Sequence, residues 1–508
     1  MIYDYVIIGS GLGGLECAYI LAKEGASVCI LEKNRQFGGN LQIFSRDKAI
    51  FDTGVHYIGG LDEGQNLYQY FKYFNIIDKL KLRRMDENGF DKITFKNEHI
   101  EYPHAMGLGN FVEQLLPFFP KEKAGLQQYV QKLDEIRRAY PLYNVENPKS
   151  GQADFPYLHD NARDFIANCT QNQRLRNVLA GSNMLYAGHG YNAPLYVHAL
   201  VCNSYIDSAW KCVDGGGQIA KYLVQNIRAM GGEVRNYAEV KRLKFGEGKE
   251  ATAVELTTGE IVEGRNFIAN NHPTQLLDMI EDKGRVRMAY RNRINNLENS
   301  ISSFTVHLVF KPDSFPYLHH NAYHHEDTDA WAGLVYTAKD WPPGYAVFVP
   351  ATSRSERWAD CMNVMTYMRM SEVAKWADTF HTVPKNRSLR SDDYQTFKTD
   401  RAEKLLDLLE RRFPDIRSHI QTYYTTTPLS YRDYIGTKDG SMYGILKDCR
   451  DPLSTFITPR TKIPNLFLTG QNINLHGVLG VTISAMVTCG QFLGIDYLIG
   501  QVRAAQKI

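Results

Sequence analysis

Three glycines near the N-terminus, in the phrase GSGLGG at 9–14, restrict the fold of this chain more than any other feature. The phrase follows an apolar run at 3–8 that predicts a buried strand, and it leads into a helix predicted at 15–23. A second strand is predicted at 27–31. A strand, a glycine turn, a helix and a second strand within about 30 residues are typical of a parallel, doubly wound α/β sheet.

The spacing of these glycines fits a dinucleotide-binding turn. Gly9 allows the tight turn, Gly11 lets the backbone approach a pyrophosphate, and Gly14 lets the helix pack closely on the strand. The helix N-terminus then offers unpaired N–H groups and the positive end of its dipole to phosphates. Glu32, which ends the second strand, can accept hydrogen bonds from ribose hydroxyls and disfavours a 2′-phosphate.

Composition excludes several classes of function. The 58 basic and 56 acidic residues leave a net charge of +2, so nucleic acid is not an expected partner. The eight cysteines include no CxxC pair, which favours a reduced, intracellular protein. The histidine-rich phrase at 318–329 matches no common ligand spacing, so we predict an exposed polar loop there and no metal site.

The length of 508 residues predicts more than one domain. Strand and helix patterns like those of the first segment return in the middle of the chain and near its end. We therefore predict an α/β fold with a discontinuous Rossmann-type domain made of 1–74, 206–300 and 456–508. The segments between them, 75–205 and 301–455, are predicted to form an inserted α+β substrate-binding domain. Further predicted elements are hairpins at 41–52 and 93–103, helices at 121–138, 219–230 and 402–413, and strands at 303–310 and 361–370.

Two apolar stretches raise the question of membrane contact. The stretch 477–499 is long enough to span a bilayer but is rich in glycine and alanine, and we favour a buried helix. The amphipathic stretch 109–119 fits either a helix at a bilayer interface or a core helix, and we favour the core.

Three phrases carry a resemblance to a known group of proteins. They are FDTGVHYIGG at 51–60, TPLSYRDYIGTKDGSMYGI at 427–445 and NLFLTGQNINLHGVLG at 465–480. Over most of its length the chain resembles the family of retinol saturase, carotenoid isomerase and phytoene desaturase, within the flavin amine oxidase-like superfamily. The pair Gly38-Gly39 before a hairpin resembles the flavin-binding start of that superfamily. The resemblance implies FAD, and the absence of a second GxGxxG phrase argues against a built-in NADPH domain.

The resemblance also implies site residues. His56, Tyr57 and His476 are candidates for catalysis, and Tyr431, Arg432 and Tyr434 for substrate contact. Asp52 is predicted to be a turn or capping carboxylate, and Arg432 has the alternative of a structural ion pair with Asp433. The predicted FAD-binding residues are Gly9, Gly11, Leu12, Gly13, Gly14, Glu32, Lys33, Arg35, Gly38, Gly39, Asn40, Gly54, Val55, His56, Val240, Asn270, Gly470, Gln471, Gly477, Val478, Gly480 and Val481.

The function that the resemblance implies is redox chemistry at a carbon–carbon double bond of a hydrophobic, polyene-like substrate. We favour saturation, with cis–trans isomerisation and desaturation as alternatives. More distant alternatives are an amine oxidase and a non-enzymatic binder of prenylated proteins of the GDP-dissociation-inhibitor type. An external electron donor or acceptor is expected, with NADPH, a quinone and a redox protein all open. We expect a cytoplasmic protein that contacts the membrane surface.

Overall fold

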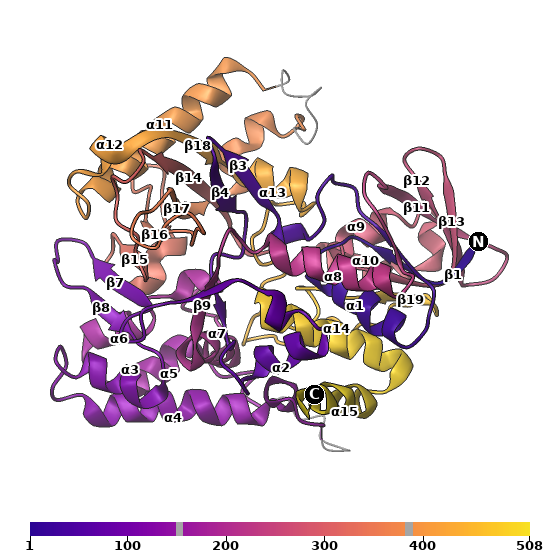
Figure 1. Ribbon diagram of the computed structural model, residues 1–508, viewed down its shortest axis with the longest axis horizontal. Coiled ribbons are helices and arrows are strands. Elements are labelled where there is room, and N and C mark those ends of the chain that lie inside the picture. The colour runs from indigo at the N-terminus through magenta and orange to yellow at the C-terminus, as the bar shows by residue number, and fades with distance from the viewer. Residues whose placement is uncertain (149–155, 381–389, 508) are drawn as a thin grey trace.

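The computed structural model describes residues 1–148, 156–380 and 390–507 (Figure 1). Residues 149–155 and 381–389, which belong to the predicted second domain, lie outside this description. One large sheet has the strand order β10-β2-β1-β13-β12-β11, with β19 also paired to β13. Its parallel strands are β1 (Ile2–Ile8), β2 (Val28–Leu31), β10 (Glu233–Arg235), β13 (Ile261–Ala269) and β19 (Leu466–Leu468). The antiparallel edge is formed by β11 (Val240–Phe245) and β12 (Ala251–Leu256).

Helices from three distant parts of the sequence pack together beside this sheet. They are α1 (Leu12–Lys23), α8 (Gly217–Ala229) and α14 (Gly477–Leu493), and α1 contacts both of the others. Figure 1 shows them side by side against β1 and β19. The helix predicted at 15–23 begins earlier, at Leu12, because Gly13 and Gly14 form its first turn. The predicted α/β class with a Rossmann-like sheet is confirmed, and the exact domain boundaries stay predictions.

A second large sheet lies on the other side of the molecule. Its order is β18-β14-β17-β16-β15-β7-β8, and its neighbours are antiparallel except for β15 with β7. Figure 1 shows helices α3 (Leu108–Leu115), α4 (Lys123–Ala139) and α7 (Leu195–Asp207) below this sheet. The strands are β7 (Asp91–Phe95), β8 (Tyr102–His104), β14 (Ser302–Phe310), β15 (Asn321–His325), β16 (Gly344–Phe348), β17 (Cys361–Met368) and β18 (Ile420–Thr426).

Most predicted elements are confirmed. The hairpin at 41–52 consists of β3 (Ile43–Arg46) and β4 (Ala49–Asp52), and the hairpin at 93–103 consists of β7 and β8. The strands predicted at 303–310 and 361–370 are β14 and β17. The helix predicted at 402–413 is the C-terminal part of α11 (Asp392–Glu410).

The prediction of an exposed loop at 318–329 is wrong. Residues Asn321–His325 form the strand β15 inside the second sheet. The buried His325 ring bonds the Gly181 carbonyl through Nε2 at 2.8 Å, and His324 Nδ1 lies 3.0 Å from the Thr94 hydroxyl. These partners are distant in sequence, so the local pattern could not reveal them. Within the described ranges no group of three or more His, Cys, Asp or Glu side chains could hold a metal ion.

The stretch 477–499 divides into two helices. After α14 the chain bends by 119° and continues as α15 (Ile495–Ala504). Among the described residues, no single helix has both the length and the apolar character needed to cross a membrane. The side chains of Ile483, Met486 and Cys489 on α14 are buried, as expected for a core helix. The amphipathic helix α3 likewise buries Phe111 and Leu115.

Candidate active site

A cavity of about 540 Å³ begins where β1, β2 and β13 end and extends toward the second sheet. The carboxyl ends of parallel strands are the usual place for a ligand in a doubly wound sheet. The nucleotide end is lined by the glycine turn, the ends of the parallel strands, residues 38–40, the start of β11 and the start of α14. The predicted residues among them are Gly9, Gly11, Leu12, Gly13, Glu32, Lys33, Gly38, Gly39, Asn40, Val240, Asn270, Gly470, Gln471, Gly477, Val478, Gly480 and Val481. Gly54, Val55 and His56 line it as well.

The backbone of the nucleotide end is packed so closely that side chains would not fit. A Cβ on Gly11 would lie 2.7 Å from Asn270 Nδ2, and one on Gly13 would lie 3.1 Å from the Cα of Gly470. A Cβ on Gly39 would lie 3.1 Å from the Cα of Gly11. Such close backbone approach, at the N-terminus of α1, is what a bound pyrophosphate needs. Gly14 lies behind the cavity lining and packs against the Gly9 carbonyl.

The Glu32 carboxylate organises the same turn. Its Oε2 atom accepts hydrogen bonds from the Ser10 backbone N–H at 3.0 Å and from the Ser10 hydroxyl at 2.6 Å. Its Oε1 atom accepts the Asn34 N–H at 2.8 Å. The residue is only 5% exposed and lines the cavity. Glu32 therefore holds the glycine turn in place, in addition to the ribose contact that the sequence predicts.

Three buried polar atoms of the cavity wall lack partners. They are Asn40 Oδ1, His56 Nδ1 and Asn271 Oδ1, which have no hydrogen-bond partner within the described part of the chain, and all three residues line the cavity. Buried polar atoms in folded proteins are nearly always hydrogen-bonded. Together with the glycine cradle, these three atoms fit a polar ligand that extends from the strand ends toward His56. A dinucleotide has the required length and polarity.

Asp52 connects the phrase FDTGVHYIGG to the second helix of the first domain. Its Oδ1 atom accepts the Gly216 N–H at 2.8 Å, directly before α8. Burial raises the pKa of this carboxyl to about 7. This contact supports the predicted role of Asp52 as a capping carboxylate.

The two candidate catalytic histidines are both neutral. Burial lowers the pKa of His56 to about 3 and that of His476 to about 4. The His56 ring stacks on Phe348 with centroids 4.3 Å apart and planes 9° apart. His476 Nε2 lies 2.9 Å from the Leu185 carbonyl oxygen, which can only accept, so the ring proton is on Nε2 and is committed to that contact. Both rings line the cavity, where they shape its wall.

Tyr57 belongs to a buried hydrogen-bonded group. Its hydroxyl lies 2.9 Å from Asp91 Oδ2 and 2.8 Å from the hydroxyl of Tyr323 on β15. Asn321 Nδ2 donates to the other oxygen of Asp91 at 3.0 Å. Tyr57 and Tyr323 line the cavity, and Asp91 is fully buried behind them. Burial raises the pKa of Asp91 to about 7.

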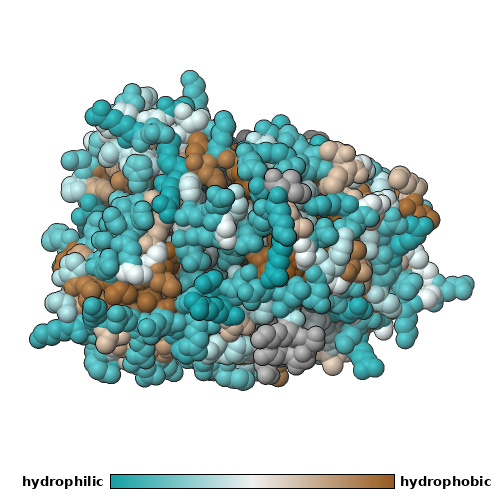
Figure 2. All heavy atoms as spheres, turned by 60° about the horizontal axis from the view of Figure 1, so that its bottom comes forward, coloured by the Kyte–Doolittle hydropathy of each residue, from teal (hydrophilic) through white to brown (hydrophobic). Residues whose placement is uncertain are grey.

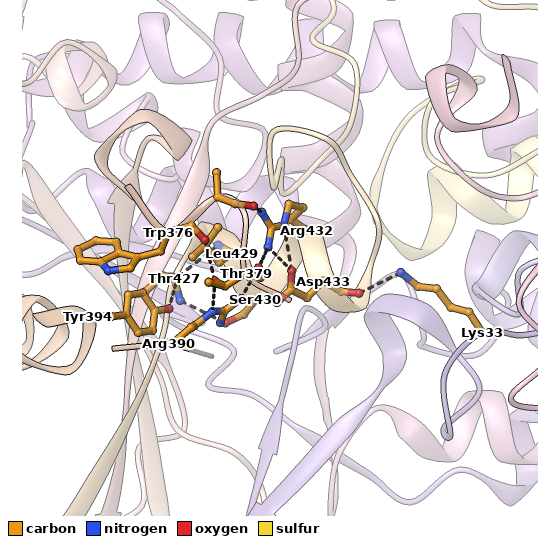
Figure 3. A network of polar contacts seen from close by, with 11 residues as sticks. Lys33, Trp376, Thr379, Arg390, Tyr394, Thr427, Leu429, Ser430, Arg432 and Asp433 are labelled. Carbon is orange, nitrogen blue, oxygen red and sulfur yellow. Dashed lines mark hydrogen bonds and ion pairs between the residues drawn. The ribbon is translucent and has the colours of Figure 1, made fainter. Parts of the chain in front are cut away.

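The predicted substrate residues divide into two kinds. Tyr431 and Tyr434 line the cavity. Arg432 lies outside the lining, and its guanidinium bonds the Asp433 carboxylate at 2.7 Å and the carbonyls of Ala377 and Thr379 (Figure 3). The structure therefore does not support substrate contact by Arg432, and it contains the alternative, a structural ion pair with Asp433.

Of two further residues predicted to bind FAD, Lys33 and Arg35, only Lys33 lines the cavity. Lys33 lines the cavity and donates to the Asp433 carbonyl at 2.9 Å, which ties the nucleotide end to α13 (Pro428–Tyr434), as Figure 3 shows. Arg35 is exposed and lies outside the cavity lining, so the structure does not support a cofactor contact by its side chain.

Most residues of the cavity wall that faces the second sheet were not predicted from the sequence. Asp91 was missed because it stands in no motif; an acidic residue directly before an apolar strand is the only local signal. The aromatic residues were missed because they come from separate strands, helices and turns. The unpredicted members of this wall are Tyr205, Tyr323, Phe348, Met365, Met442 and Tyr443.

Comparisons with known proteins agree with this geometry. Residues 7–74 match the family model of an NAD(P)-binding Rossmann-like domain. The chain is 26% identical to an all-trans-retinol 13,14-reductase of Danio rerio, with 96% of this chain and 86% of that protein covered. It is 23% identical to a chloroplastic prolycopene isomerase of Daucus carota, with 97% and 80% covered. A solved structure of putrescine oxidase bound to putrescine has a TM-score of 0.64 at 15% identity, with 98% of this chain and 99% of that chain covered.

These similarities extend over nearly the whole chain. They confirm the predicted resemblance and the predicted class, an oxidoreductase. The likeness to putrescine oxidase shows the fold alone, because the identity is low. The Rossmann-like match covers the glycine turn and Glu32, which line the cavity, and this fits a dinucleotide cofactor.

Proposed function

We propose that this protein is an FAD-dependent oxidoreductase that reduces a carbon–carbon double bond of a hydrophobic polyene. The observation that carries the proposal is one continuous cavity with two different ends. A glycine cradle and Glu32 form one end, and tyrosine, phenylalanine and methionine side chains form the other. A dinucleotide held in the first end would extend its reactive ring toward a substrate in the second.

The cofactor and the protein would divide the chemistry. A bound, reduced flavin supplies a hydride. The glycine turn and Glu32 hold the dinucleotide, Asn40 and His56 offer unpaired polar atoms to it, and the aromatic wall excludes water from the reacting carbons.

The distribution of charge in the cavity favours an apolar substrate over an amine. The acidic residues among the lining that the structure describes are Glu32, Glu239 and Asp278. All three belong to the nucleotide end, on β2, β11 and α9 (Pro273–Asp278) or next to them. A cationic amine beside the aromatic wall would therefore meet no carboxylate among the lining residues there, since Asp91 is buried behind Tyr57, and burying an unpaired charge is costly. A polyene carries no such charge.

Saturation is favoured because the all-trans-retinol reductase is similar over almost its full length. Isomerisation, as in the name of the Daucus carota relative, and desaturation are the alternatives. We further propose that an external donor reduces the flavin and that the enzyme works in the cytoplasm at a membrane surface. The face drawn in Figure 2 has an apolar patch at its lower left, shown in brown, and this patch supports peripheral contact of this kind.

The test is an anaerobic reaction of the purified protein. The protein should be yellow, and dithionite should bleach it. Addition of a polyene such as all-trans-retinol should restore the colour and yield a product that has gained two hydrogens. A product of unchanged mass would indicate an isomerase, and a colourless protein that does not take up FAD would overturn the proposal.

His56→Phe is expected to keep the flavin and to lower turnover by no more than about tenfold. The phenyl ring can keep the stack on Phe348, and a neutral imidazole with so low a pKa is not a proton donor, whose loss costs about 10²–10⁴-fold. Flavin content and steady-state turnover check this result. His99→Phe, at an exposed site outside the lining, is the control. A loss of a hundredfold or more with full flavin content would assign the proton transfer to His56.

A further inference from the structure

A row of three hydrogen-bonded groups leads from the protein interior to the cavity wall. They are Asp91, Tyr57 and Tyr323, and each can donate or accept a proton. The three groups come from β7, from the segment after β4 and from β15. The two links are 2.9 Å and 2.8 Å long, and no other partner stands between the groups. Asp91 is 0% exposed, so any proton that it exchanges with the cavity must pass through the tyrosines.

The direction of these hydrogen bonds depends on the charge of Asp91. A tyrosine hydroxyl has one proton to donate. When Asp91 is ionised it can only accept, so Tyr57 donates to Asp91 and Tyr323 donates to Tyr57. Both hydroxyl protons then point away from the cavity, and none is available to a substrate.

Protonation of Asp91 reverses the direction of these hydrogen bonds. Asn321 Nδ2 donates to Oδ1, so the acid proton lies on Oδ2 and is donated to Tyr57. Tyr57 then donates to Tyr323. The proton of Tyr323 is left without an acceptor inside this group and is free for an acceptor in the cavity, whose wall Tyr323 helps to form.

We propose that Tyr323 is the proton donor of the reaction, with Tyr57 and Asp91 as the relay that resupplies it. This inference rests on the proposed saturation. One carbon of the double bond receives the hydride, and the other carbon forms a C–H bond with the proton of Tyr323 as the O–H bond breaks. Tyr323 regains a proton from Tyr57, and Tyr57 from Asp91. After the product leaves, a proton from water in the cavity returns to the Asp91 carboxylate through Tyr323 and Tyr57 before the next turnover.

The surroundings of Asp91 allow this role near neutral pH. Burial raises the pKa of Asp91 to about 7, while Lys211 and the bonds from Asn321 and Tyr57 oppose the rise. Lys211 is itself buried, which lowers its pKa to about 7, and its Nζ donates to the Val349 carbonyl at 2.9 Å. The titratable groups that face Asp91 are Tyr57, Tyr205, Tyr323, Cys202, Lys211 and His104.

Three variants test the relay by activity. Tyr323→Phe should lower turnover by about 10²–10⁴-fold with full flavin content, as expected for loss of a proton donor.

Turnover of the parent enzyme should fall above about pH 7, and Asp91→Asn should be slow and should lack this fall at alkaline pH. Lys211→Met removes a positive charge near Asp91 and should raise the pH above which turnover falls. Tyr497→Phe, which breaks a surface tyrosine–carboxylate bond to Glu24, is the matched control.

A readout without turnover separates this inference from the proposed function. Infrared spectra of the cofactor-free protein should contain a protonated carboxyl band that is lost between about pH 6 and pH 8 and is absent from Asp91→Asn. Asp52 titrates in the same range, so Asp52→Asn identifies its band. An Asp91 already ionised at about pH 6, or a Tyr323→Phe enzyme with normal turnover, would overturn the relay. A product of unchanged mass would instead overturn the saturation, and the infrared result would stand.

Discussion

Gly14→Ala is expected to weaken FAD binding by about 100-fold. The new Cβ would lie 2.3 Å from the Gly9 carbonyl oxygen and 3.1 Å from Asn270 Nδ2. Gly9 cannot easily withdraw, because its N–H is bonded to the Leu31 carbonyl at 2.9 Å and its φ is +94°. The helix start and the glycine turn must therefore separate, which displaces the N–H groups that would face the pyrophosphate. Overpacking typically costs about 1–3 kcal/mol, so we expect FAD affinity to fall by about 100-fold.

Flavin absorbance per protein and titration of the cofactor-free protein measure this loss. Gly500→Ala is the matched control, because Gly500 lies in α15, no heavy atom lies within 4 Å of its added Cβ, and its φ is ordinary. That variant should bind FAD normally. Circular dichroism shows whether Gly14→Ala is still folded. A folded Gly14→Ala protein that binds FAD as tightly as the parent would contradict the role assigned to the close packing of helix and strand.

The first domain was predictable because its signals are local. Apolar strands, three spaced glycines and Glu32 lie within 32 residues and report on one βαβ unit. Even the return of the chain to this sheet at β19 was visible, because a short apolar strand precedes a glycine-rich helix start. The start of α1 was missed by three residues because a sequence pattern cannot show that glycines of the turn already belong to the helix.

The second domain was less predictable because its strands depend on distant partners. β15 reads Asn-Ala-Tyr-His-His, which has no apolar alternation, yet it pairs with β7, more than two hundred residues earlier. The contact between Tyr57 and Asp91 is likewise made by the packing of whole segments. Tyr57 was identified because it belongs to a recognisable phrase, whereas Tyr323 stands in no motif and Asp91 has only its place at the start of an apolar strand. Most of the predicted residues therefore lie at the nucleotide end of the cavity, and most of the aromatic wall was not predicted.

Glu32→Ala is expected to weaken FAD binding by about 100-fold or more and to lower the thermal stability of the cofactor-free protein. The carboxylate accepts three hydrogen bonds from Ser10 and Asn34, and hydrogen bonds to charged groups contribute about 1.5–3 kcal/mol each. Alanine leaves these donors unpaired in a buried turn and removes the acceptor for the ribose. Glu32→Gln retains one acceptor oxygen, so its loss of affinity should be intermediate, about tenfold.

The two variants separate the two roles of Glu32. If the carboxylate only organised the turn, FAD affinity and the melting temperature of the cofactor-free protein would fall in parallel across Gln and Ala. A direct ribose contact adds a loss of affinity that exceeds the loss of stability, and we expect this excess in both variants, since an amide is a weaker acceptor than a carboxylate. Glu263→Ala, at an exposed position on strand β13 of the same sheet, is the matched control. Isothermal titration with FAD and thermal unfolding of the cofactor-free proteins measure both quantities, and unchanged affinity in Glu32→Ala would exclude any part for this residue in cofactor binding.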